Sequence, residues 1–277
     1  MKKSKIIVPA LGILVLSTAA AVTGTVAWFT SSNLVSVTGL HAKVDAETGI
    51  VISNEAKSTW ATSTTAQHNG QEQAFMLTST SDLTTWYHNN SNNANEHTAA
   101  GDYDTLTVNK PAAGTTDQNT GLGTTTFQGL KKNVYLINRF YIKSASGVEL
   151  ANQKLHVKNI AATAAGNSAE LNKALRVAFV YGSKQVVYGV FNGFTGSYKV
   201  GGATQAFEPK DGSVDEGADI QELASGITIP SYNTTTPLEI ETYVYFEGED
   251  EAAKSANITA SLDDITISFE FENEKIA

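Results

Sequence analysis

Apolar and polar side chains alternate along several stretches in the second half of this chain. The clearest stretch is 265–272, in which the apolar positions are Ile265, Ile267, Phe269 and Phe271. The same period of two recurs at 131–143, 175–181 and 238–246. Because successive side chains of a strand point to opposite faces, this period predicts half-buried β-strands and leaves little room for long helices.

Turn signals separate these stretches into short elements. Gly182-Ser183 lies between a predicted strand at 175–181 and another at 186–191, which is typical of a hairpin. About eight short strands with few helices favour two packed sheets. The predicted fold class is all-β: an antiparallel jelly-roll-like sandwich with long polar loops and one or two short helices.

Two capping patterns predict the short helices. Asn167, with Glu170 three residues later, predicts a helix that ends near Ala174. Asp219, with Glu222 three residues later, predicts a second helix that Gly226 terminates. Both helices would be peripheral to the sandwich.

Composition narrows the classes of function. The chain has no cysteine, which excludes thiol catalysis and cysteine-ligated metals. Its net charge of −9 argues against a nucleic acid as partner. A soluble surface protein fits this charge and also fits the abundance of aromatic and β-branched residues.

The stretch 53–128 differs from the rest of the chain. It is rich in Thr, Ser, Asn, Ala and Gly, and few apolar residues recur in it with any period. Short strands are expected only at 75–77 and 103–108. The remainder is predicted to be a polar insertion of long, solvated loops.

The N-terminal 30 residues have the layout of a secretory signal. Three lysines precede an apolar run from Ile6 to Val22, and small residues follow before the pair Trp28-Phe29. Small residues at Thr25 and Ala27 predict cleavage between Ala27 and Trp28. The alternative is an uncleaved membrane anchor, since the apolar run is long enough to span a bilayer. With cleavage, the membrane is a partner only before the cut, and the protein is secreted to the extracellular matrix or cell surface.

Residues 28–52 are predicted to form an extended N-terminal segment in front of a β-sandwich domain at 53–277. Within this segment the apolar positions change phase at Gly39, where a bulge or kink would reset the faces. Val35 and Val37 share the first phase. The second phase contains Leu40, Ala42 and Val44.

Catalytic patterns are missing from the sequence, and no enzyme is predicted. The histidines form no HExxH pair, and no GxSxG motif is present. Glu96-His97 and His88 could contribute to a zinc site, but chance proximity explains their spacing better. No cofactor is therefore expected.

Two acidic clusters leave calcium as an alternative. The first cluster consists of Asp211, Asp215, Glu216 and Asp219. The second consists of Glu247, Glu249, Asp250 and Glu251. Calcium takes carboxylate and carbonyl oxygens from flexible loops, but neither cluster has EF-hand spacing. Solvated acidic loops are the simpler interpretation.

The stretch Gly24-Thr25-Val26-Ala27-Trp28-Phe29-Thr30 resembles the end of the signal peptide in the TasA/camelysin family of secreted biofilm matrix proteins of Gram-positive bacteria. The order of the predicted strands near 133–143 and 265–271 is also similar to that in this family. The insertion 53–128 departs from the shorter members of the family. The resemblance implies processing by a dedicated SipW-type signal peptidase and copies of the chain as partners. It implies a jelly-roll subunit that self-assembles into extracellular fibres.

In such fibres the resemblance implies donor-strand complementation, in which the mature N-terminal segment completes the sheet of a neighbouring subunit. The donor side chains would be Val35, Val37, Leu40, Ala42 and Val44. The alternative is that the same strand packs within its own domain. The resemblance to the camelysin branch also raises proteolysis, against which the missing HExxH weighs.

A binding module is the alternative function. Aromatic side chains in the polar insertion, if exposed, could stack on sugars, as in a cell-surface adhesin or a carbohydrate-binding sandwich. The candidates for such stacking are Trp60, Trp86 and Tyr87.

Overall fold

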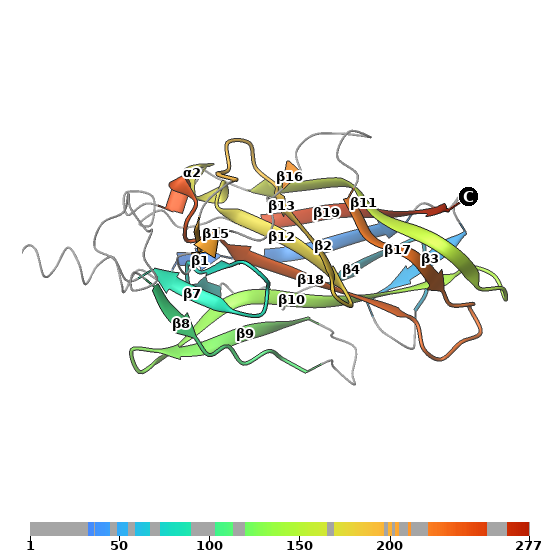
Figure 1. Cartoon of the computed structure of the whole chain (residues 1–277), viewed down its shortest axis with the longest axis horizontal. Coiled ribbons are helices and arrows are strands. Elements are labelled where there is room, and N and C mark those ends of the chain that lie inside the picture. The colour runs from blue at the N-terminus through green and yellow to red at the C-terminus, as the bar shows by residue number, and fades with distance from the viewer. Residues whose placement is uncertain are drawn as a thin grey trace, which may run out of the picture. The chain divides into compact units, whose positions relative to one another are not determined.

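The computed structural model describes residues 33–35, 37–44, 49–54, 59–66, 73–89, 103–112, 120–164, 169–196, 199–200, 203–204, 210–211, 221–253 and 265–276. The chain divides into two units, 1–32 and 33–277, and the description below concerns the second. Most of the described residues are in strands, and two sheets pack face to face (Figure 1). The all-β prediction is therefore confirmed.

The first sheet is centred on one long strand, β10 (Leu130–Ser144). Its path among the described residues runs β1 (Asn33–Val35), β5 (Gln73–Phe75), β10, β18 (Leu238–Phe246), β12 (Leu175–Tyr181), β13 (Lys184–Gly189) and β16 (Lys210–Asp211). Two further strands, β3 (Ile50–Ser53) and β9 (Thr120–Phe127), also pair with β10. The predicted hairpin between 175–181 and 186–191 is confirmed as β12 and β13.

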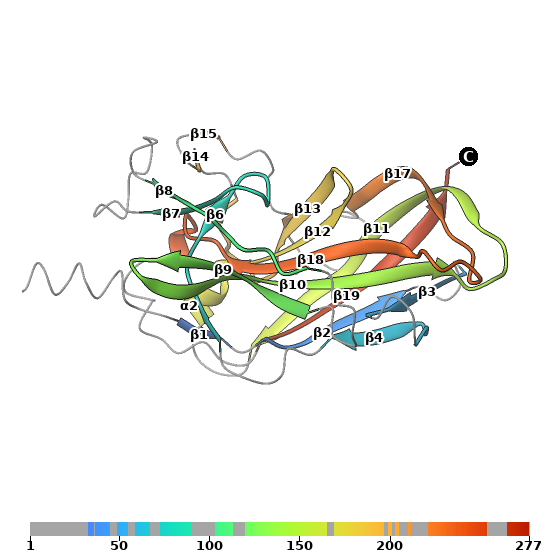
Figure 2. The ribbon, with the colours of Figure 1, turned by 90° about the horizontal axis from the view of Figure 1, so that it is seen from below.

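The second sheet contains the N-terminal strand beside the C-terminal one. Its order is β17 (Gln221–Ile229), β11 (Leu150–Ala164), β19 (Ile265–Lys275), β2 (Val37–Val44) and β4 (Ser63–Ala66) (Figure 2). Most pairs are antiparallel, but β2 runs parallel to β19, β5 to β10 and β13 to β16. Strands far apart in the sequence are thus neighbours in the sheet.

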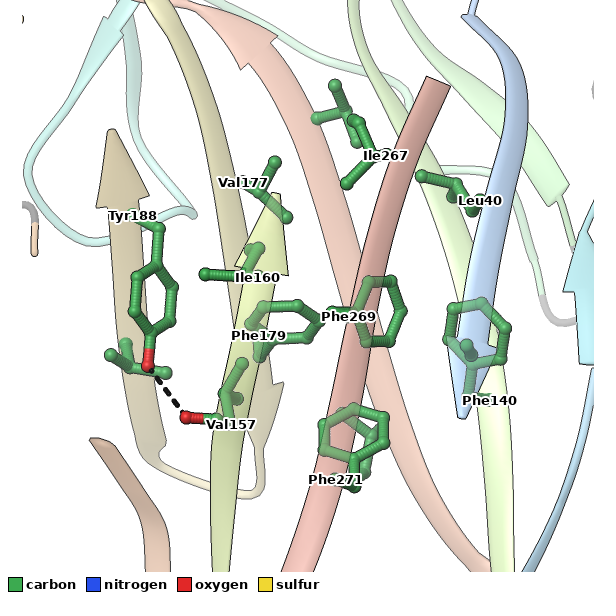
Figure 3. Packing of buried hydrophobic residues seen from close by; sticks show 14 of the residues in the cluster. Leu40, Phe140, Val157, Ile160, Val177, Phe179, Tyr188, Ile267, Phe269 and Phe271 are labelled. Carbon is green, nitrogen blue, oxygen red and sulfur yellow. Dashed lines mark hydrogen bonds between the residues drawn. The ribbon is translucent and has the colours of Figure 1, made fainter. Parts of the chain in front are cut away.

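Phenylalanines from both sheets form the centre of the core (Figure 3). Phe179 of the first sheet lies 4.8 Å from Phe269 and 5.5 Å from Phe271 of the second, measured between ring centroids. The rings meet edge to face, the arrangement that aromatic pairs prefer. The alternation predicted for 265–271 is confirmed, because all four of its apolar residues are buried.

The polar insertion is more ordered than predicted, and the prediction of solvated loops was wrong for much of it. A small sheet of β6 (Ser79–Thr80), β7 (Trp86–Asn89) and β8 (Tyr103–Leu106) contributes to a second apolar cluster with residues of β10, β12, β13 and β18. Leu83, Trp86 and Leu106 are its buried members from the insertion. These three residues are spaced irregularly in the sequence. Their burial therefore could not be predicted from a periodic pattern.

One predicted helix was wrong. Residues 221–229 form β17, which pairs with β11. Gly226 has φ +67°, and the β11–β17 register shifts on both sides of it, so this glycine lies in an irregular strand rather than at a helix end. The other predicted helix is present as the four-residue α2 (Ala169–Asn172), and one turn of 3-10 helix, η3 (Glu251–Ala253), follows β18.

The predicted irregularity at Gly39 is confirmed. Val37 is the partner of Ile265, whereas Gly39 is the partner of the next residue, Thr266. Two residues of β2 therefore lie opposite one residue of β19, which is a β-bulge. Beyond this bulge the pairing is regular, and Leu40, Ala42 and Val44 alternate with exposed residues so that all three are buried.

Candidate functional site

The N-terminal strand β2 lies between two neighbours in its own sheet. On one side it pairs in parallel with β19, with Leu40 opposite Ile267 and Ala42 opposite Phe269. On the other side it pairs antiparallel with β4 from Leu40 to Lys43. In the single chain, β2 therefore occupies an interior position, which corresponds to the intramolecular alternative stated above.

The inward face of β2 belongs to the main core. Leu40, Ala42 and Val44 are buried in the same cluster as the phenylalanines. Figure 3 shows Leu40 beside Ile267, its register partner on β19. Fully burying a leucine or valine side chain is worth roughly 1.5–3 kcal/mol, so vacating this position costs several kcal/mol. The side chains of Val35 and Val37 lie outside the described residues.

The outward face of β2 makes polar contacts with both neighbouring strands. His41 Nδ1 lies 3.0 Å from Thr65 Oγ1 on β4. Lys43 Nζ lies 3.5 Å from Glu270 Oε1 on β19, and 63% of the lysine side chain is exposed. Exposed ion pairs of this kind contribute little stability. Apolar burial and the two hydrogen-bonded edges thus hold β2 in place.

Four strands at the sheet edges are poorly suited to simple edge-to-edge pairing. β1, β4 and β16 have three, four and two residues respectively. β17 is longer, but its pairing with β11 shifts register three times. Short and bulged edges are the devices by which sheet proteins avoid lateral association. Exchange of an interior strand does not require an open edge.

The second acidic cluster uses its carboxylates within the protein. Asp250 Oδ2 accepts hydrogen bonds from Arg176 Nη2 at 2.6 Å and from the backbone N–H of Thr195 at 2.7 Å. Both charged side chains of this pair are fully buried. Glu247 accepts a hydrogen bond from Ser79, and Glu249 accepts one from Tyr103. These contacts join β12, β18 and the insertion.

Among the residues that the structure describes, no three His, Asp or Glu side chains come together in a group that could bind a metal ion. Of the first acidic cluster only the backbone of Asp211 is described, and Asp215, Glu216 and Asp219 lie outside the described ranges. His97 likewise lies outside them. His88 is partly buried on β7, where its Nδ1 lies 3.2 Å from the carbonyl oxygen of Leu77, and this burial lowers its pKa.

Trp86 is buried and cannot stack on a sugar. The centroid of its ring lies 4.8 Å from that of Tyr135 on β10 and 5.1 Å from that of Tyr245 on β18. Trp60 and Tyr87 are partly buried, and the Trp60 ring lies 4.5 Å from Lys143 Nζ. The three aromatic residues proposed to stack on sugars therefore do not form one exposed surface.

Four tyrosines of the first sheet have pKa values raised above the usual value of a phenol. Burial, with Glu241 nearby, raises the pKa of Tyr135 to about 12, and burial with Glu239 raises the pKa of Tyr141 to about 12. Burial also raises the pKa values of Tyr243 and Tyr245. The cause is common to all four, because a buried phenolate loses its hydration.

Alkaline pH is therefore expected to unfold the protein cooperatively. Each folded pKa lies above the unfolded value near 10, so the stabilisation is complete below pH 10 and is lost as pH rises through 12. Each of the four tyrosines lowers the free energy of unfolding by about 1.4 kcal/mol per pH unit in that window. Tyrosinate absorbance should rise together with loss of circular dichroism, and Tyr135→Phe should flatten the transition. Gradual ionisation of a folded protein near pH 10 would contradict this.

The predicted signal and its cleavage point, Ala27 and Trp28, lie outside the described residues. No helix among the described ranges has the length and apolar character needed to cross a membrane. Comparison with known proteins adds no relative: no family model, curated protein or solved structure matches the chain.

Proposed function

We propose that this chain is a secreted structural protein that self-assembles into extracellular matrix fibres by exchange of its N-terminal strand. The observation that carries the proposal is the position of β2, an interior strand that is close to the N-terminus and buries its apolar face in the main core. A strand of the same sequence from a second copy would make the same contacts. Such a swap gives up no contact once it is complete.

The connections of β2 suit this exchange. Its main partner, β19, is the C-terminal strand, so no short turn ties the two together. The chain returns from β2 to the first sheet through Gly49, which has φ +73°. In the exchanged form, β3 would stay on its own β10 while β1 and β2 move to a neighbour. Gly49, which lies between β2 and β3, would mark the hinge.

The proposed life cycle begins with the signal. A dedicated signal peptidase cuts between Ala27 and Trp28, and the mature N-terminus then precedes β1 by a few residues. The similarity of residues 24–30 to the TasA/camelysin signal end supports this step. Copies of the same chain are the partners, and the extracellular matrix or cell surface is the location. The role is structural rather than catalytic.

Electron microscopy of the purified mature chain, from Trp28 onward, tests the proposal. Fibres should appear slowly, because β2 must leave its own position before it can fill another, and mild heating should accelerate them. The chain with residues 1–27 still attached is the matched control and should assemble more slowly. A mature protein that stays monomeric under all of these conditions would refute the proposed function.

A further inference from the structure

Three large hydrophobic side chains stand out as exposed among the described residues: Leu130 at 58%, Val148 at 68% and Tyr232 at 46%. Their distribution follows β10. Leu130 is the first residue of this 15-residue strand, and Val148 lies in the turn just beyond its last residue, Ser144. The backbone N–H of Tyr232 donates to the carbonyl oxygen of Ser146 in that turn, at 2.9 Å. Exposed apolar side chains therefore lie at both ends of this strand, one at its start and two beyond its end.

The two ends are well separated. A strand of this length spans about 46 Å, and both views place the β9–β10 hairpin and the turn after β10 at opposite ends of the sandwich (Figures 1 and 2). At the first end, Leu130 follows a two-residue turn in which Gln128 and Gly129 have φ +49° and +77°. A tight turn of this kind projects its flanking side chain rigidly.

The second end is a rigid corner. Lys143 Nζ donates to the carbonyl oxygen of Thr234 at 2.6 Å and lies 4.5 Å from the ring of Trp60 and 5.8 Å from that of Tyr232. These contacts fix the loop 230–234 against the end of β10. Val148 and Tyr232 are thus presented on an ordered surface, which reduces the entropy lost on binding.

Charge at the two ends is complementary. Lys131 follows Leu130, and Glu149 follows Val148, and both charged residues are exposed. Opposite rim charges around apolar contacts favour one docking orientation. We propose that the Leu130 end of one copy binds the Val148–Tyr232 corner of the next. Such a head-to-tail contact is heterologous, and because its two patches lie at opposite ends of the sandwich, we expect it to propagate as a linear array rather than close into a ring. It deepens the proposed self-assembly but is independent of strand exchange.

The test uses a protein in which exchange is blocked. His41 and Ser268 are register partners on β2 and β19, and both are exposed. A variant with His41→Cys and Ser268→Cys, oxidised, holds β2 on its own β19. Sedimentation velocity should show weak association above roughly 0.1 mM, as a small interface predicts. Leu130→Asp in this protein should weaken association at least about tenfold. Lys184→Glu, on the β12–β13 hairpin, is the exposed control and should have no effect.

Mixing two defective proteins tests the direction of the contact. Leu130→Asp removes one end and Val148→Asp removes the other, so an equimolar mixture should form a dimer and nothing longer. Lys131→Glu with Glu149→Lys should restore the association that either change alone weakens. A stapled protein that stays monomeric, or association indifferent to both end variants, would overturn the inference. End-to-end association without fibres from the unstapled protein would leave it standing and refute strand exchange instead.

Discussion

Joining β2 covalently to its own β19 is expected to abolish fibre formation. In the oxidised protein with His41→Cys and Ser268→Cys, β2 cannot leave its position between β19 and β4, so no neighbour can receive it. Fibre mass, measured by pelleting and electron microscopy, should fall at least about tenfold relative to the wild type. Because the chain has no cysteine of its own, no competing disulfide can form. Reduction should restore assembly of the same sample.

The same disulfide reports on the folded monomer. It closes a loop of more than 200 residues, which is expected to raise the free energy of unfolding by roughly 4–5 kcal/mol if the geometry is unstrained. A raised melting temperature would therefore establish the β2–β19 pairing within one chain. The matched control is Lys154→Cys with Glu274→Cys, which joins β11 to β19 and leaves β2 free. This control should form fibres both oxidised and reduced. Equal fibre yields from both oxidised proteins would exclude strand exchange.

Deletion of residues 28–44 is a simpler experiment than the disulfide, but it is less informative. The structure places Leu40, Ala42 and Val44 in the main core, so the deletion would also open a cavity and expose the edges of β4 and β19. Loss of fibres after such a deletion would not separate lost exchange from lost folding. The disulfide keeps every core contact.

Local patterns predicted the parts of the fold that depend on neighbouring residues. The alternation at 265–271 and the bulge at Gly39 could be predicted because each follows from the period of a single strand. The pairing of β2 with β19 could not be predicted, because it joins residues more than 200 positions apart. Burial of Trp86 was missed for the same reason, since its ring partners come from β10 and β18.

The glycine at 226 shows how a local rule can fail. Asp219, Glu222 and Gly226 have the spacing of helix caps, yet residues 221–229 form β17. Ile227 and Ile229 are buried with Thr228 exposed between them, which is strand periodicity. Burial against the core outweighed a capping preference worth about 1 kcal/mol. Among the candidate site residues, Leu40, Ala42 and Val44 were correctly assigned to one buried face. Their position between β19 and β4 could not be predicted.

The buried pair of Arg176 and Asp250 was not apparent from the sequence either. Arg176 lies on β12 among apolar residues, and its partner follows β18, 74 positions later. The guanidinium also donates to the carbonyl oxygens of Lys173 and Thr195, at 2.8 and 3.0 Å, and lies 5.3 Å from the ring of Phe194. An arginine at an alternating strand position beside buried residues is the one signal that could have suggested a buried partner.

Removing the carboxylate of this pair is expected to cost the protein about 3–5 kcal/mol, because Asp250→Ala leaves the Arg176 charge buried without its counterion. Urea unfolding of the mature protein should show a lowered midpoint with an unchanged slope. Exposed Glu170 pairs with Lys173 at 2.9 Å in the adjoining helix, so Glu170→Ala is the matched control and should cost under about 1 kcal/mol.

The location of the destabilised backbone amides identifies the cause of the lost stability. Asp250 also accepts the backbone N–H of Thr195 and, through its other carboxylate oxygen, that of Ala252. Hydrogen exchange at these two amides should therefore accelerate in Asp250→Ala more than in Glu170→Ala. A double variant with Arg176→Met and Asp250→Leu removes both charges, and it should recover much of the lost stability because no charge is left buried alone. If Asp250→Ala proves as mild as Glu170→Ala, the pair does not hold β12, β18 and the loop 191–196 together.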